Sequence, residues 1–201
     1  MTFNERAQSK IRANDAVLIF GDIQEGITSL PLTVAREDLC RAAGALARLG
    51  EIFDIPTITL SIPKWDESDP QVVDEIARNR TRITHFHRTC CDSFEDKKIA
   101  EYLSKTGRKS LIICGIATEI VVQWLVLSGL RNHFLVHVVL DACGGLSERS
   151  EEAALRRFEA AGAILTSVVA LAGELAGDFS KEPGRSAVGV VYDLIAKKSF
   201  Q

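Results

Sequence analysis

The sequence lacks the features of a nucleic-acid-binding or membrane protein. Its 24 Lys and Arg are outnumbered by 27 Asp and Glu, the net charge is -3, and no basic cluster stands out. Nucleic acid is not an expected partner, because phosphate binding requires concentrated positive charge. The first ten residues contain no apolar run, and runs such as LIIC and FLVHVVL are far too short to span a bilayer. We therefore expect a soluble cytoplasmic protein with no membrane partner.

Motifs for cofactors and metals are also missing. The sequence has neither GxGxxG nor GxxxxGK[ST], and it has no GxSxG elbow. The segment SIPKWDESDP contains no histidine, and no second cysteine pair has zinc-ligand spacing. The sequence thus predicts no cofactor and no metal. The cysteines are odd in number and favour reduced thiols over a disulfide framework; they are Cys40, Cys90, Cys91, Cys114 and Cys143.

What is present is a regular alternation of apolar runs with stretches of helical spacing over residues 1–201, which we expect to form a single domain. The apolar runs predict buried strands at residues 16–20, 56–60, 82–87, 110–114, 134–140 and 163–168. Helical spacing predicts helices at residues 36–49, 71–78, 93–105, 118–130 and 151–161. This alternation predicts a three-layer α/β/α fold with a six-stranded, mostly parallel sheet. In the tail at residues 180–201, a last helix is possible at 188–197.

Ligands of such sheets bind beyond the carboxyl ends of the strands. The candidates at those ends are Asp22, Leu60, Ser61, His87, Arg88, the turn 115–118 and Asp141. Asp22 directly follows an all-apolar strand, so partial desolvation would raise its pKa and suit it to proton transfer. The alternative is that Asp22 caps the next turn or helix.

The end of the predicted third strand offers several more candidates. By strand alternation His85 and His87 share one face and Arg88 lies on the other, so a histidine or the arginine could be the charge partner of Asp22. The alternatives are a histidine satisfied by the backbone and a solvated arginine. Cys90 and Cys91 follow, and either could be reactive near Arg88 or could be an inert small residue before a helix.

The turn 115–118 joins the fourth predicted strand to a helix. Gly115 permits an unusual backbone, and Thr118 can cap the helix. The free N–H groups of such a turn can hold an anion or an oxyanion. An ordinary strand-to-helix turn is the alternative.

Taken together, these pieces resemble the isochorismatase-like (cysteine hydrolase) family over about residues 13–176. The resemblance rests on AVLIFGDIQEG, DSFEDKKIAEYLSKTGRKSLIICGIATEIVVQ, VVLDACGG and FEAAGAILTSVVALAGEL, in that order and spacing. It is strongest to the uncharacterised-hydrolase branch, whose members tend to form larger homo-oligomers. The resemblance implies a six-stranded parallel sheet with helices on both sides.

The resemblance also implies catalytic positions. The family uses an Asp, a Lys and a Cys. The Asp matches Asp22, the Lys falls on His87 or Arg88, and the Cys falls on Val121. A cis peptide is implied at Ile116–Ala117, with oxyanion donors at the backbone N–H groups of Ala117 and Val121. The remaining binding positions carried over by the match are Ile116, Thr118 and Gln24.

Valine cannot attack a carbonyl, so this chain departs from the family at its nucleophile. Three hypotheses follow. The chain is a hydrolase of a small amide, ester or vinyl ether that works through Asp22 without a thiol. Alternatively, it is a catalytically degenerate member that binds a small molecule or serves as a structural oligomer. In the third, Cys90 or Cys91 supplies a relocated nucleophile. A homo-oligomer is also predicted, because SVVALAGELAG and SAVGVVYDLI hold more apolar surface than one strand and its helix need.

Overall fold

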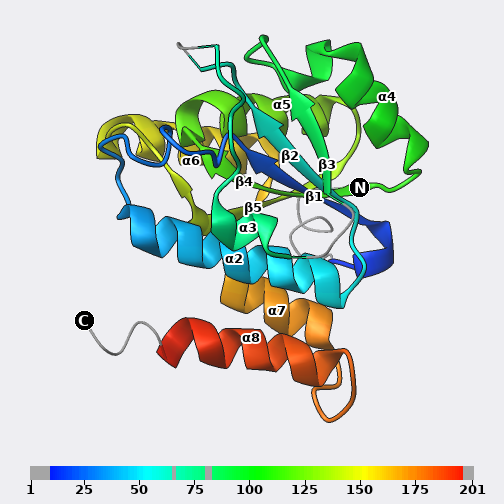
Figure 1. The fold of residues 1–201 in the computed structure, drawn as a ribbon. Coiled ribbons are helices and arrows are strands. Elements are labelled where there is room, and N and C mark those ends of the chain that lie inside the picture. Colours follow the sequence, from blue (N-terminus) through cyan, green and yellow to red (C-terminus); the bar gives the residue numbers. More distant parts are fainter. Residues whose placement is uncertain (1–9, 65–66, 80–82, 197–201) are drawn as a thin grey trace.

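The computed structural model describes residues 10–64, 67–79 and 83–196. Six strands form one sheet in the order β3-β2-β1-β4-β5-β6, and every neighbouring pair is parallel (Figure 1). The strands are β1 (Ala16–Gly21), β2 (Thr57–Ser61), β3 (Ile83–His87), β4 (Ser110–Ile116), β5 (Leu135–Gly144) and β6 (Ile164–Thr166). The predicted α/β fold is confirmed, and the sheet is parallel throughout. The strand order reverses between β1 and β4, so ligands are expected at the carboxyl ends of these two strands.

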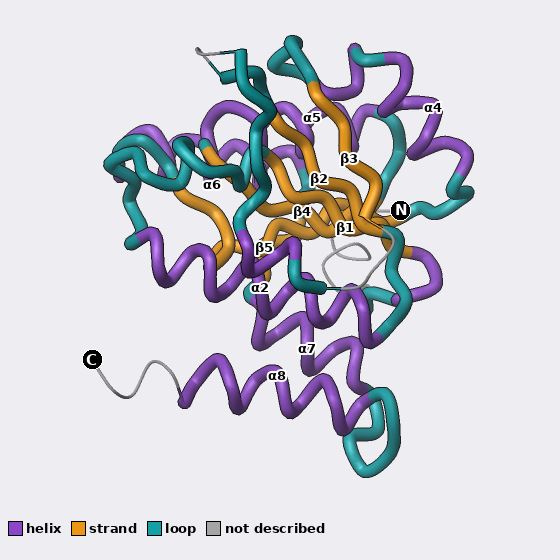
Figure 2. Tube along the Cα trace, in the orientation of Figure 1, coloured by secondary structure: helices purple, strands orange, loops and turns teal. Residues whose placement is uncertain are grey.

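Helices cover both faces of the sheet (Figure 2). The helices are α2 (Arg36–Ile52), α3 (Asp74–Ala77), α4 (Lys97–Lys105), α5 (Gln123–Arg131), α6 (Glu148–Ala161), α7 (Val168–Ala176) and α8 (Gly184–Ala196). Short turns of helix are η1 (Ala13–Asp15), η2 (Ser93–Glu95) and the π-helix η3 (Thr118–Val122). Helices α2, α3, α7 and α8 lie on one side, where α8 is outermost and packs on α7 and α2. None of the described helices is both long and apolar enough to cross a membrane.

The central strands are the most apolar part of the chain. All six residues of β1 and all seven of β4 are buried, as a strand covered by helices on both faces requires. Helices α6 and α4 begin at side-chain caps: the hydroxyl of Ser147 accepts a hydrogen bond from the N–H of Ser150, and a carboxylate oxygen of Asp96 accepts one from the N–H of Lys98. Gly162, in the left-handed region at φ 96°, ends α6.

The structure corrects several predicted boundaries. The strand predicted at 134–140 runs on to Gly144, because β5 continues past a register shift until Cys143 pairs with Gly115 and Gly144 with Ile116. Pairing with β4 outweighs the turn-like composition of these residues. The sixth strand ends at Thr166 rather than at 168, and α7 begins at Val168.

The helix predicted at 71–78 is only the four-residue α3, because Val72 forms a β-bridge with Gln24 and keeps the preceding segment extended. The helix predicted at 118–130 begins as a π-helix, and the one predicted at 93–105 is split into η2 and α4. The last helix begins at Gly184, before the predicted residue 188. Residue 82, which begins the predicted third strand, and residue 197, which ends the predicted last helix, lie outside the described ranges.

Candidate functional site

Asp22 lies at the carboxyl end of β1, where the strand order reverses. Its backbone adopts a φ of 53°, a conformation that Asp tolerates better than most residues. Its N–H donates to the carbonyl oxygen of Leu60 at 3.1 Å, which ties the end of β1 to β2. Asp22 is only 4% exposed, so its carboxyl group is largely removed from water.

Arg88 is the charge partner of Asp22. It follows β3 directly, and its N–H donates to the carbonyl oxygen of Ser61 at 3.0 Å. One guanidinium nitrogen, Nη2, donates to Oδ2 of Asp22, and Nη1 donates to the carbonyl oxygen of Cys90 at 2.6 Å. Arg88 is also 4% exposed, so the two form a buried ion pair. Of the two residues that the resemblance left open for the lysine position, the structure brings Arg88 to Asp22.

Burial dominates the electrostatics of this pair. It raises the pKa of Asp22 to about 6, although the charge of Arg88 and its hydrogen bond both lower that pKa. Oδ1 of Asp22 and Nε of Arg88 are buried and have no hydrogen-bond partner within the described residues. The pair therefore contains one buried acceptor and one buried donor that are unpaired among the described residues.

The turn after β4 lies directly against the end of β1. Gly115 has a φ of 151°, and a Cβ atom there would lie 2.3 Å from the carbonyl oxygen of Gly21, so only glycine fits. The peptide bond between Ile116 and Ala117 is cis. Val121 is fully buried, and a Cβ on Gly21 would lie 3.1 and 3.2 Å from its two methyl groups. Asp22 and the turn therefore meet through Gly21, and the side chain at the family's nucleophile position is apolar.

Two binding candidates, Gln24 and Thr118, make intramolecular side-chain hydrogen bonds. The side-chain amide of Gln24 is bonded in both directions to Ile62: it donates to the carbonyl oxygen at 3.2 Å and accepts from the N–H at 3.0 Å. It joins the loops that follow β1 and β2. The hydroxyl of Thr118 donates to Oε1 of Glu151 at 2.7 Å and does not cap its own helix. No signal in the sequence indicates either partnership.

His87 does not reach the ion pair. Its Nδ1 lies 2.8 Å from the hydroxyl of Ser61, and the same hydroxyl lies 2.9 Å from Nε2 of His85. Nδ1 of His85 lies 2.7 Å from the hydroxyl of Thr59. Burial, and next the charge of His87, lower the pKa of His85. Both histidines thus lie on one face of β3, as strand alternation predicts, while Arg88 turns to the other.

The thiols divide into two groups. Cys40, Cys114 and Cys143 are buried, and burial raises their pKa values: that of Cys40 to about 11, that of Cys143 to about 12, and that of Cys114 well above its ordinary value. These thiols stay protonated and unreactive. Cys90 is half-buried and Cys91 is exposed. Arg88 binds the backbone carbonyl of Cys90.

Metal ligands are not clustered in this region. Within residues 10–64, 67–79 and 83–196, no group of three or more His, Cys, Asp or Glu side chains could hold a metal ion. The site, as far as it is described, therefore consists of one carboxylate, one guanidinium and the backbone of the turn.

Comparison with known proteins identifies the family of the chain. The family model described as "Isochorismatase domain" matches residues 16–169. The probable hydrolase YcaC of Escherichia coli is 28% identical over 174 residues, covering 86% of this chain and 83% of that protein. The isochorismatase domain-containing protein 2 of Macaca fascicularis is 33% identical over 174 residues, covering 84% and 79%.

Two solved structures are similar over most of both chains. The E. coli YcaC structure, described as an octameric hydrolase of unknown specificity, has a TM-score of 0.81 and 27% identity, covering 92% of this chain and 88% of that one. YcaC from Pseudomonas aeruginosa, with hexane-2,5-diol and covalent acrylamide, has a TM-score of 0.84 and 26% identity, covering 96% and 98%.

Proposed function

The chain belongs to the isochorismatase family, and we propose that it is a hydrolase in which Asp22 performs the proton transfer and water replaces the thiol nucleophile. The substrate would be a small amide, ester or vinyl ether. The observation that carries the proposal is the buried Asp22 whose pKa is raised to about 6 beside Arg88. A group that titrates near the working pH is suited to both accept and release a proton.

For an amide or ester, Asp22 would act first as a base. It takes a proton from a water molecule while the water oxygen forms a bond to the carbonyl carbon. The resulting oxyanion would be held by the backbone N–H groups of Ala117 and Val121, which do not depend on the side chain at position 121. As the bond to the leaving nitrogen or oxygen breaks, Asp22 returns the proton to it. Arg88 orients the carboxylate and offers its unpartnered Nε to the substrate.

A second function is favoured by a specific observation. Asp22 and Arg88 are each 4% exposed and are bonded to one another, which is also the arrangement of a structural ion pair. In that case the protein keeps the fold and the pocket of the family but only binds a small molecule, or serves as an oligomeric structural protein.

The test is an assay of the full chain against a panel of small amides, esters and vinyl ethers. Asp22→Asn should lower any activity of the wild type by about 10²- to 10⁴-fold, the usual contribution of a general base. The matched control is Asp54→Asn, because Asp54 is an exposed aspartate with a similar φ of 48°. The control variant should retain full activity.

Further variants separate the competing hypotheses. If Asp22→Asn retains an activity that Cys90→Ser or Cys91→Ser loses, the nucleophile is a relocated thiol. A wild type that is inactive on the whole panel, together with an inactive Val121→Cys variant, would favour the binding function over hydrolysis.

A further inference from the structure

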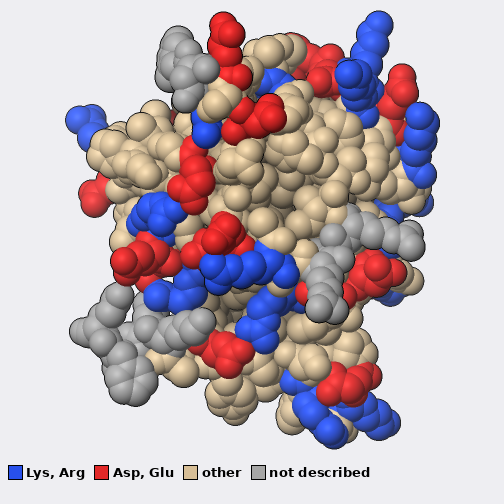
Figure 3. Space-filling view, viewed as in Figure 1, with Lys and Arg blue, Asp and Glu red and all other residues tan. Residues whose placement is uncertain are grey.

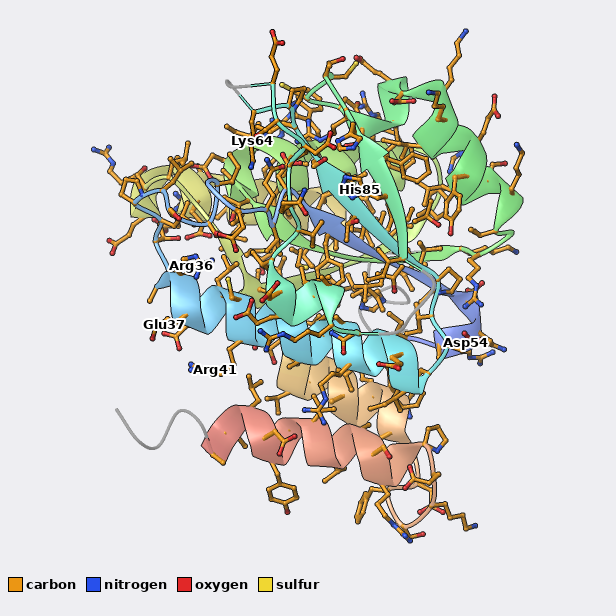
Figure 4. All side chains as sticks on the ribbon, viewed as in Figure 1. Arg36, Glu37, Arg41, Asp54, Lys64 and His85 are labelled. Carbon is orange, nitrogen blue, oxygen red and sulfur yellow. The ribbon has the colours of Figure 1, made fainter. Side chains whose placement is uncertain are left out.

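The histidines of β3 form a hydrogen-bonded cluster that is separate from the Asp22–Arg88 pair. His85 and His87 are both exposed, and their ring centroids are 4.5 Å apart. Thr59 and Ser61 of β2 lie in register with them. Figure 4 shows His85 on β3, well away from Arg36 and Arg41 on α2. The proposed hydrolase reaction uses none of these four side chains.

Two imidazole nitrogens converge on one point of this cluster. Nε2 of His85 and Nδ1 of His87 lie 2.9 and 2.8 Å from the hydroxyl oxygen of Ser61. That hydroxyl has one proton and can donate to only one of the two nitrogens. A cation bound near this point would accept the lone pairs of both nitrogens. Zinc–nitrogen bonds are about 2.0–2.1 Å long, so a cation held by both nitrogens would displace the Ser61 hydroxyl from its place between them.

The other ring nitrogen of His85, Nδ1, has a hydrogen-bond partner that orients the ring for metal binding. Its Nδ1 lies 2.7 Å from the hydroxyl of Thr59, which is 2% exposed and held by β2. Metal-bound histidines almost always donate their other N–H to an oxygen, which fixes the tautomer and the ring orientation. With the proton on Nδ1, the lone pair of His85 is on Nε2 and faces Ser61.

The two histidines are exposed to solvent, whereas Ser61 and Thr59 beneath them are buried. His85 and Thr59 line a cavity of about 350 Å³, whose other walls include Val72 and Ile83. Solvent at the exposed edges of the two rings could complete a coordination shell. Over β2 and β3 the surface carries few Lys, Arg, Asp or Glu side chains, whereas charges gather along α2 and α8 (Figure 3).

We infer that His85 and His87 chelate one first-row transition-metal cation, such as Zn²⁺, Ni²⁺ or Co²⁺, next to the hydroxyl of Ser61. Imidazole suits these metals, whereas Mg²⁺ and Ca²⁺ require oxygen ligands, chiefly carboxylates, that the cluster lacks. With two protein nitrogens only, the remaining positions are filled by solvent, as in an open rather than a structural site.

Cobalt titration of the full, chelator-treated chain tests this assignment. The wild type should bind one Co²⁺ per chain, with d–d absorption and without a thiolate-to-cobalt charge-transfer band. His85→Gln and His87→Gln should each abolish binding, and Thr59→Val should weaken it by about tenfold through loss of orientation. His133→Asn is the matched control: it removes an exposed histidine at a φ of 65°, which Asn tolerates. The double variant of Cys90→Ser and Cys91→Ser should bind normally.

A second measurement on the wild type does not depend on how the variants fold. Zn²⁺ should protect His85 and His87, but not His133, from carbethoxylation, as read by mass spectrometry. The inference is overturned if the wild type binds no cobalt, if both histidine variants still bind it, or if binding is lost in the cysteine variant.

Discussion

Two opposing effects set the pKa of Asp22: its burial and the neighbouring charge of Arg88. Burial raises the pKa of Asp22 to about 6, and Arg88 acts in the opposite direction. Arg88→Met should therefore move the titration midpoint of Asp22 above 6, while Arg88→Lys, which retains the charge, should shift it less. Carbon-13 NMR of the Asp22 carboxyl group against pH measures this midpoint. An unchanged midpoint in Arg88→Met would mean that the guanidinium has no electrostatic effect on Asp22.

His137 is a second buried ionisable residue, and its lowered pKa makes the folded protein less stable as pH falls. It is 1% exposed, neither ring nitrogen has a partner among the described residues, and burial lowers its pKa to about 4. Between about pH 6.5 and 4 the unfolded chain binds a proton that the folded chain does not, so stability falls as pH falls, by about 3 kcal/mol.

The raised pKa of Asp22 has the reverse effect on stability. Its contribution is fully present below its ordinary pKa of 3.8 and is lost, by about 3 kcal/mol, as pH rises through about 6. The two contributions oppose each other. His137→Leu should remove the loss of stability that protonation of the unfolded chain causes at low pH. The difference in unfolding free energy between the variant and the wild type should therefore favour the variant more at pH 4 than at pH 7. Urea unfolding at the two pH values measures this, and an equal effect of the substitution at both would contradict it.

Among the elements, the turn after β4 is the most constrained. Gly115→Ala would place a Cβ 2.3 Å from the carbonyl oxygen of Gly21 and 2.8 Å from its Cα, in a backbone region that alanine rarely adopts. The turn and the end of β1 would have to separate. We expect a loss of more than about 3 kcal/mol of unfolding free energy and of any hydrolytic activity. Gly107→Ala is the control, because Gly107 also has a positive φ, of 66°, but nothing lies within 4 Å of its Cβ position. Equal losses in the two variants would show that the close approach to Gly21 is not decisive.

The elements also show what the sequence can predict. The apolar runs of β1 and β4 identify central strands, because only a sheet covered on both faces buries every residue. The extension of β5 to Gly144 could not be predicted, since it depends on pairing with β4 and not on local composition. Strand alternation places His87 and Arg88 on opposite faces of the third strand, but it does not predict which of these faces lies toward Asp22. The hydrogen bonds of Gln24 and Thr118 join loops that are distant in the sequence, so no local pattern indicates them.

For the whole molecule, the outer helices raise the question of assembly. Tyr192 and Ile195 on α8 are 70% and 52% exposed, and Phe179 before it is 68% exposed. Packing between α7 and α8 accounts for only part of the apolar surface of these segments. Exposed apolar surface commonly marks an interface, so we propose that this chain forms a homo-oligomer.

Light scattering tests the assembly. The molar mass of the wild type should exceed that of a monomer at micromolar concentration. Ile195→Glu should lower this molar mass, because it would place an unpaired charge in the interface. Ala153→Glu, on the exposed face of α6 across the sheet, should leave it unchanged. A monomeric wild type would refute the oligomer, and an unaffected Ile195→Glu variant would place the interface elsewhere.

The central claim is that Asp22 is the proton-transferring group of a hydrolase, and the pH dependence of kcat/KM tests it most directly. On the panel substrate that the wild type hydrolyses fastest, kcat/KM should rise through about pH 6, as Asp22 becomes the ionised base. The rise should disappear in Asp22→Asn and persist in Asp54→Asn. A profile with no inflection near that pH, or an inflection that survives in Asp22→Asn, would contradict the account.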